Sequence, residues 1–120
     1  MIASYTSKLG RKPHQRKQLL RNLATSLLLY ESIHTTRSRA KAVQRLIERM
    51  IARSKVNPPH VAVRFLNTIV TDKNASRKMM EVLVQRFQKR SSGFSRIKLL
   101  GRRVGDGAEL VEISLMDEKL

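Results

Sequence analysis

The apolar pattern of this chain changes its period at Gly93. Before that residue, apolar side chains recur every three or four positions in four stretches, the spacing that places them on one face of a helix. After it they alternate with polar residues, which predicts strands whose two faces differ. Since 120 residues leave room for little more than one domain, the pattern predicts a small α+β fold.

Local signals divide the part before Gly93 into four helices and one strand. Residues 13–30 predict a basic amphipathic helix that begins at Pro13, and residues 31–36 predict a short strand. A second helix is expected to begin at Thr36 or Ser38 and to end near Ser54. Prolines 58 and 59 then start a third helix, whose inward side chains are expected to be Val61, Ala62, Phe65, Leu66 and Ile69. A fourth helix opens at Asp72 or Asn74, ends near residues 91–93, and has an apolar face of Met79, Met80, Leu83, Val84 and Phe87.

The part after Gly93 predicts an antiparallel hairpin. The glycines around Asp106 supply the positive φ angles that a hairpin loop needs. Arg96 and Lys98 are expected on the outer face, and the inward side chains are expected to be Phe94, Ile97, Leu99, Val111, Ile113 and Leu115. The fold is therefore α+β in the order helix, strand, three helices, two strands, with a small, mostly antiparallel three-stranded sheet covered by helices on one face. Residues 1–12 are expected to be a flexible basic arm, 13–117 a single domain and 118–120 a tail.

Charge indicates the kind of partner. The chain has 25 Lys and Arg residues but only 9 Asp and Glu residues, a formal net charge of +16. Residues 1–57 carry thirteen cations against two carboxylates, residues 58–103 carry eleven against two, and residues 104–120 carry one against five. Such an excess favours a nucleic acid as partner. The acidic last segment is expected to face away from that polyanion.

The sequence lacks the residues that several classes of functional site require. The chain has no cysteine, and His14, His34 and His60 are scattered without a carboxylate or second histidine at helical spacing, so we expect no metal site and no cofactor. The glycine-rich segment 101–107 lacks the Lys-Ser/Thr ending of a nucleotide-binding loop, and no nucleophile motif is present. We therefore expect no enzyme activity and no small-molecule substrate. The longest apolar run, residues 27–30, is far too short for a membrane span.

The aromatic content distinguishes between kinds of nucleic-acid binder. Only five aromatic residues occur and they are dispersed, whereas proteins that read unpaired bases usually place aromatics among basic residues on strands. The composition therefore favours a folded RNA recognised through its phosphates and shape. A DNA-packaging protein is the alternative, although neither a helix-turn-helix nor a wedge-bearing β-arm is evident. A small hydrolase or nuclease is a third reading that would need clustered carboxylates or histidines.

Two stretches resemble a known family. Residues 10–27 (GRKPHQRKQLLRNLATSL), followed by residues 30–36 (YESIHTT) and 39–41 (RAK), closely resemble the opening of bacterial-type large-subunit ribosomal protein seventeen. Residues 93–97 (GFSRI), 101–106 (GRRVGD) and 111–113 (VEI) look like that family's C-terminal hairpin, at the right distance from the first match. The resemblance covers residues 8–117. The family usually begins with a basic stretch, whereas this chain has no charged residue before Lys8.

The resemblance implies a structural part of the large ribosomal subunit, near the exit of the nascent-chain tunnel, without enzymatic activity. Its partners would be large-subunit ribosomal RNA and neighbouring ribosomal proteins, in a cytoplasmic ribosome or an organellar one. By position, the resemblance implies that eight residues contact RNA: Arg11, Arg16, Lys17, Arg21, Asn22, Arg96, Arg102 and Arg103. Charge adds to this predicted RNA-binding set Lys8, Lys12, Arg37, Arg39, Lys41 and Lys98.

Overall fold

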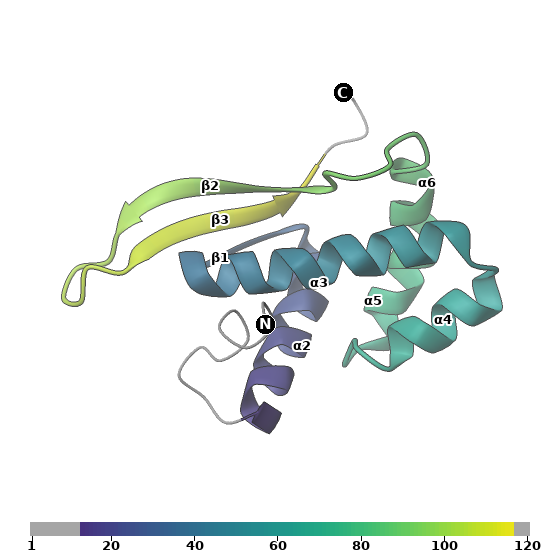
Figure 1. The fold of residues 1–120 in the computed structure, drawn as a ribbon, viewed down its shortest axis with the longest axis horizontal. Coiled ribbons are helices and arrows are strands. Elements are labelled where there is room, and N and C mark those ends of the chain that lie inside the picture. The colour runs from purple at the N-terminus through teal and green to yellow at the C-terminus, as the bar shows by residue number, and fades with distance from the viewer. Residues whose placement is uncertain (1–12, 117–120) are drawn as a thin grey trace.

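The helices and strands follow one another in the predicted order in the computed structural model, which describes residues 13–116 (Figure 1). The predicted arm over residues 1–12, with Lys8, Arg11 and Lys12, and the predicted tail over 118–120 lie outside these described residues. The elements are α2 (Pro13–Tyr30), β1 (Ser32–Thr36), α3 (Arg37–Val56), α4 (Pro59–Asn67), α5 (Lys73–Lys78), the π-helical turn η1 (Met79–Leu83), α6 (Val84–Arg86), β2 (Ser95–Arg102) and β3 (Glu109–Leu115).

The sheet has β3 at its centre. The three described strands are antiparallel in the order β1-β3-β2, so that Ile113 lies between Ile33 and Ile97. Val111, Ile113 and Leu115 are buried against α2 and α3, whereas the residues that alternate with them in β3 are half-buried. Helices thus cover one face of the sheet, and the predicted α+β arrangement is confirmed.

The core lies between the sheet and the helices. It takes apolar side chains from every helical segment except α6 and from the sheet: Ala24, Leu27, Leu28, Val43, Ile47, Met50, Ile51, Leu66, Met79, Leu83, Phe94, Val111 and Ile113 are among its buried members. Phe87, directly after α6, is buried as well, and its ring centroid lies 5.2 Å from that of Phe94. This aromatic pair joins the end of the last helix to the start of the hairpin.

Local signals located several turns correctly. The side chain of Asp72 accepts a hydrogen bond of 2.8 Å from the backbone N–H of Asn74 and so caps α5, as predicted. Gly105 and Gly107 have φ angles of 110° and 70°, which confirms their role in the hairpin loop. The last helix ends at Arg86, earlier than predicted, because the backbone leaves the helical conformation at Phe87 to pack its ring on Phe94.

Two inward side chains were predicted wrongly. Leu99 points to the same side of the sheet as Val111, but its side chain is 63% exposed. Leu99 lines an open hollow beside Arg37, the first residue of α3, so the helix covers it only in part. Figure 1 shows that the hairpin extends beyond this end of α3. Val61 is 39% exposed because Ala62 and Leu66, one turn apart, make the buried stripe of the short α4, and Val61 lies beside that stripe.

Candidate nucleic-acid interface

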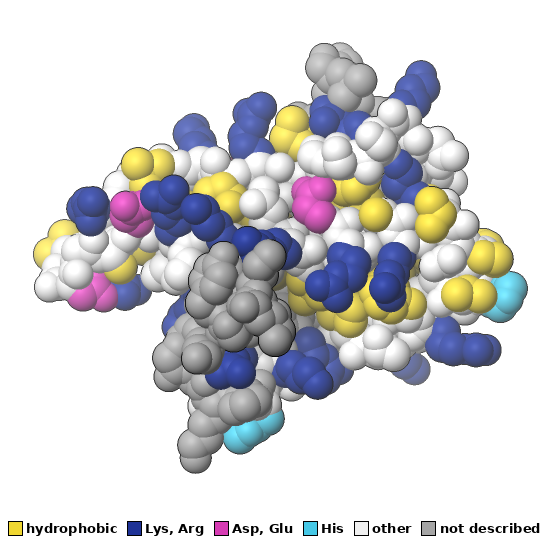
Figure 2. All heavy atoms as spheres, viewed as in Figure 1, with side chains coloured by type: hydrophobic (Ala, Val, Ile, Leu, Met, Phe, Trp, Pro, Cys, Tyr) yellow, Lys and Arg dark blue, Asp and Glu magenta, His cyan; other side chains and the backbone are white. Residues whose placement is uncertain are grey.

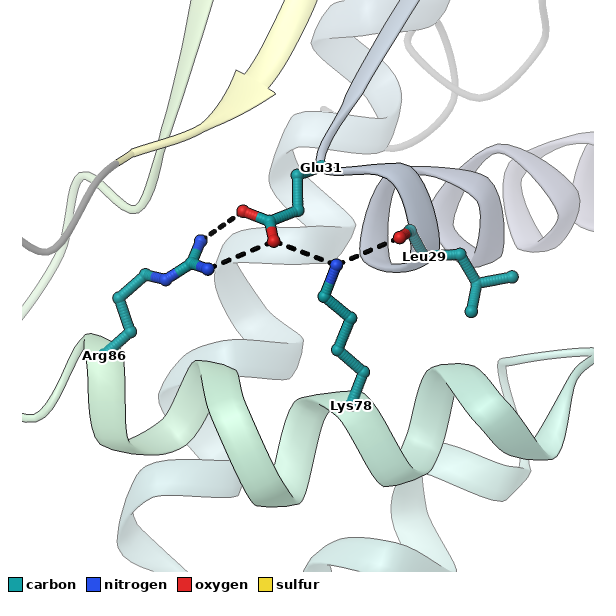
Figure 3. A network of polar contacts seen from close by, with 4 residues as sticks. All are labelled: Leu29, Glu31, Lys78 and Arg86. Carbon is teal, nitrogen blue, oxygen red and sulfur yellow. Dashed lines mark hydrogen bonds and ion pairs between the residues drawn. The ribbon is translucent and has the colours of Figure 1, made fainter.

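A carboxylate between α2 and β1 holds two cations inside the fold. Glu31 has a left-handed backbone with φ of 64°, unusual for a residue other than glycine. Its carboxylate accepts hydrogen bonds from Arg86, one of them 3.1 Å long, and lies 2.9 Å from the Nζ of Lys78 (Figure 3). Lys78 also donates to the carbonyl oxygen of Leu29 at 3.0 Å. These contacts offset the cost of the backbone conformation and remove two cations from the set available to a ligand.

The π-helical turn brings both cations to Glu31. Lys78 and Arg86 are eight residues apart, so in a regular α-helix they would point about 80° apart around the axis. The π turn, closed by the hydrogen bond from the Val84 N–H to the Met79 carbonyl, accommodates one extra residue and reduces that difference to about 20°. Both side chains therefore reach the same carboxylate, while Met79 and Phe87 stay on the buried side.

Glu31→Gln is expected to destabilise the fold at neutral pH by about 1–2 kcal/mol, a figure reduced for the side chain's one-third exposure. The hydrogen bond with Arg86 is the largest of the contacts that lower the pKa of Glu31 to about 2. Since the folded pKa lies below the unfolded one, this stabilisation is present above about pH 4.5 and is lost as the pH falls toward 2. Urea unfolding of both proteins at several pH values should show their difference shrinking over that range. Glu81→Gln, which changes an exposed carboxylate on η1 between Lys78 and Arg86, is the control. An equal loss in both variants would contradict the role of Glu31.

The predicted contacts on α2 fall into two kinds. Lys17 and Asn22 are exposed, and Asn22 accepts a hydrogen bond from Gln18 one turn before it. Arg16 is half-buried. Arg21 turns inward and donates from Nε to the carbonyl oxygen of Ile69 at 2.8 Å, which ties α2 to the segment that follows α4. Its guanidinium has further N–H donors. Arg21 therefore remains a predicted RNA contact and also stabilises the fold through its bond to Ile69.

The start of α3 and the base of the hairpin share one carboxylate. Glu109 accepts a hydrogen bond of 3.1 Å from Arg37 and lies 3.6 Å from Arg102. Both arginine side chains remain more than half exposed, at 54% and 70%. Lys41 is exposed one turn beyond Arg37, and Arg39 is half-buried beside a hollow of about 260 Å³ on the other side of the hairpin base. The structure thus brings together Arg37, Lys41 and Arg102, from segments about 60 residues apart, and leaves Arg39 on the other side.

The hairpin tip holds Arg103 in a fixed position. Its Nε donates to Asp106 Oδ1 at 3.1 Å, and the same oxygen accepts the backbone N–H of Ala108. The hydrogen bond with Arg103 is the first cause, and that backbone N–H the second, of a lowering of the pKa of Asp106 to about 2. Because a guanidinium has five N–H donors, an Arg103 held in this way can still donate to a phosphate.

The open face of the sheet carries the other predicted hairpin contacts. Arg96 and Lys98 are exposed on it, beside Ser114 and Glu112 of β3. Glu112 accepts hydrogen bonds from Ser32 at 3.0 Å and from His34 at 3.3 Å, and these two contacts, in that order, lower its pKa. The prediction that the acidic last segment faces away from a polyanion stays a prediction, and the structure adds that Glu112 is engaged by side chains of a neighbouring strand. As the central strand, β3 places Glu112 between His34 of β1 and Lys98 of β2.

A row of cations on α3 lay partly outside the predicted set. Residues 41, 45, 49 and 53 are Lys or Arg at intervals of four, and all are exposed. In the part of the chain that the structure describes, Lys41, Arg45 and Arg49 have no carboxylate partner. Figure 2 shows Lys and Arg side chains over the face that includes α3, with few Asp or Glu side chains. The spacing of four was the sequence signal that identifies this row.

Glu48, the one carboxylate of α3, has a structural position. It accepts hydrogen bonds from the backbone N–H groups of Gly93 and Phe94 and from the hydroxyl of Ser95. It therefore fixes the entry into β2, where Gly93 has a φ of 71°. Sequence patterns gave no sign of this contact because its partners are 45 or more residues away.

Neither a metal centre nor a membrane helix is found among residues 13–116. No group of three or more His, Asp or Glu side chains there could hold a metal ion. No helix in the same residues is long and apolar enough to cross a membrane. The arrangement is an exposed basic surface whose carboxylates are mostly occupied by internal contacts, a surface suited to an extended polyanion.

Comparison with known proteins gives a consistent result. The model of a family described as ribosomal protein L17 matches residues 19–116. The chain is 39% identical over 110 residues to the large ribosomal subunit protein bL17 of Elusimicrobium minutum, covering 92% of this chain and 93% of that protein. It is 41% identical over 109 residues to bL17 of Caldanaerobacter subterraneus, covering 91% and 96%. With bL17 of Clostridium acetobutylicum it shares 39% over 115 residues, covering 96% and 100%.

Proposed function

The chain belongs to the ribosomal protein L17 family, structural and non-enzymatic components of the large ribosomal subunit, and we propose that it binds and stabilises folded large-subunit ribosomal RNA. We place it near the exit of the nascent-chain tunnel, in contact with neighbouring ribosomal proteins of a cytoplasmic ribosome. The observation that carries the RNA-binding proposal is that carboxylates pair with groups of the protein itself, while many cations stay exposed. Glu31, Glu48, Asp106 and Glu109 all have internal partners, while basic residues line the exposed sides of α2, α3 and the hairpin.

The mechanism is neutralisation of phosphates by a preorganised platform. RNA segments that meet at a junction repel one another, and cations held between them lower that repulsion. The sheet and helices fix the cations of α3 and of the hairpin in defined positions, so their binding costs less conformational entropy than binding by a flexible basic peptide. Among residues 13–116 few aromatic side chains are exposed, which favours contacts with the RNA backbone over reading of bases.

Neutralising the two hairpin arginines, Arg102→Gln with Arg103→Gln, is expected to reduce the salt dependence of RNA binding. If both contact phosphate, the slope of log affinity against log salt concentration should decrease in magnitude by about 1.5–2. The measurement is filter binding of the full chain to large-subunit ribosomal RNA at several salt concentrations. Arg64→Gln with Lys73→Gln, which removes the same charge from exposed positions on α4 and α5, is the control. An unchanged slope in the hairpin variant would remove these two arginines from the interface.

A further inference from the structure

We infer that a row of cations along α3 forms a second RNA-binding surface, which holds the phosphate backbone of one RNA segment along the row, oblique to the helix axis. This row, the α3 ridge, consists of Lys41, Arg45, Arg49 and Arg53. Only Lys41 belongs to the set predicted from the sequence. The inference rests on the proposed function, because it names a further contact for the same kind of ligand.

The geometry of the α3 ridge is that of a linear array. Residues four apart advance about 6 Å along a helix and turn about 40° around it. The four cations therefore extend over about 18 Å along α3 and turn through about 120°, as an oblique row on the side away from the core. The opposite side is occupied by the buried Val43, Ile47, Met50 and Ile51. All four cations are exposed and therefore project from a rigid helix into solvent. A phosphate backbone is the ligand whose charges also repeat along a line.

The charge balance of α3 argues for an anion outside the protein. Like charges four residues apart destabilise a helix by about 0.2–0.5 kcal/mol per pair, and the α3 ridge contains three such pairs. Glu48, the only carboxylate within the helix, points its oxygens at the start of β2 instead. The described part of the chain thus leaves the repulsion along the ridge uncompensated. An external polyanion would relieve it.

One end of the ridge is also preorganised. The guanidinium carbon of Arg53 lies 4.9 Å from the centroid of the Phe65 ring of α4. Stacking on an aromatic ring orients the guanidinium plane and leaves its N–H donors free for a phosphate at the edge. No aromatic side chain is offered for base stacking elsewhere on the ridge, since its other members are Lys41, Arg45 and Arg49. Recognition by this surface would therefore be independent of base sequence.

The test compares two triple variants of the full chain with equal net charge. The first, Lys41→Gln, Arg45→Gln and Arg49→Gln, removes three of the four cations of the α3 ridge. The second, Arg64→Gln, Lys73→Gln and Arg77→Gln, removes three exposed cations from α4 and α5. The probe is large-subunit ribosomal RNA of Clostridium acetobutylicum transcribed in vitro, and the readout is the slope of log affinity against log salt. We expect the ridge variant to reduce the slope by about 2–3 and the control to reduce it by less than about 1.

Three further readouts keep the outcomes separate. The thermal midpoint of the ridge variant should equal or exceed that of the parent chain because like-charge pairs are removed, so weaker binding cannot come from unfolding. Equal slopes in the two triple variants would overturn the α3 ridge. So would a ridge variant that loses binding to phosphatidylglycerol vesicles while its RNA binding matches the control. If the parent chain itself does not prefer large-subunit over small-subunit ribosomal RNA, the proposed function fails rather than this inference alone.

Discussion

The affinity of the chain for isolated large-subunit ribosomal RNA is expected to fall by about 10³–10⁵-fold when the salt concentration rises from about 50 to about 200 mM. This range corresponds to roughly 6–10 phosphate contacts, each of which releases counterions when a Lys or Arg replaces them. The described structure can supply that number. Lys17, the α3 ridge, Arg96, Lys98 and the two hairpin arginines are all exposed.

Filter binding at constant magnesium, with sodium chloride varied, measures this dependence. Small-subunit ribosomal RNA of similar length serves as the control, because nonspecific attraction should give a comparable slope with lower affinity at every salt concentration. A loss of less than tenfold over the same range would mean that few phosphates are contacted. The basic surface would then need another explanation.

Phe94→Ala is expected to destabilise the fold by about 3–5 kcal/mol, a large part of the 5–15 kcal/mol typical of a small domain. The ring is 1% exposed and lies 5.2 Å from the Phe87 ring, centroid to centroid. Lys55 of α3 also contacts this ring, with its Nζ 5.1 Å from the Phe94 centroid. Removing the ring therefore leaves a cavity where the last helix, α3 and the hairpin meet.

Urea unfolding followed by circular dichroism suits this chain, which has no tryptophan. Phe94→Leu keeps most of the volume and should cost about 1–2 kcal/mol. Val104→Ala, at a hairpin residue that is 99% exposed, should change the free energy of unfolding by less than about 0.5 kcal/mol. A loss below about 1 kcal/mol for Phe94→Ala would show that the aromatic pair does not hold the hairpin to the helices.

The order of helices and strands followed from local patterns because each pattern has a local physical cause. Apolar spacing of three or four residues predicted α2 to α4, and the change at Gly93 predicted β2 and β3. Asp72 and the hairpin glycines act on backbone groups two or three residues away, so their roles were readable from the sequence. Leu99 was predicted wrongly because its exposure depends on where α3 begins relative to the hairpin.

The arrangement of charge was less predictable, since it depends on contacts between distant segments. Glu31 meets cations 47 and 55 residues further along the chain, and a π turn with no evident sequence signal aligns them. The central position of β3 puts Glu112 beside His34 and Lys98, a placement that charge sums along the sequence do not indicate. Arg21, predicted only as an RNA contact, also binds a backbone carbonyl. Composition therefore indicates a kind of partner, whereas the arrangement of charges on the surface depends on the tertiary fold.

Ultraviolet crosslinking in cells, followed by sequencing of the attached nucleic acid, tests the central claim most directly. A tagged full chain would be purified under denaturing conditions, so that only covalently attached RNA or DNA is read. We expect crosslinks concentrated at a few sites of large-subunit ribosomal RNA, and fewer of them when the α3 ridge and both hairpin arginines are neutralised. Crosslinks spread over genomic DNA or unrelated transcripts would contradict it.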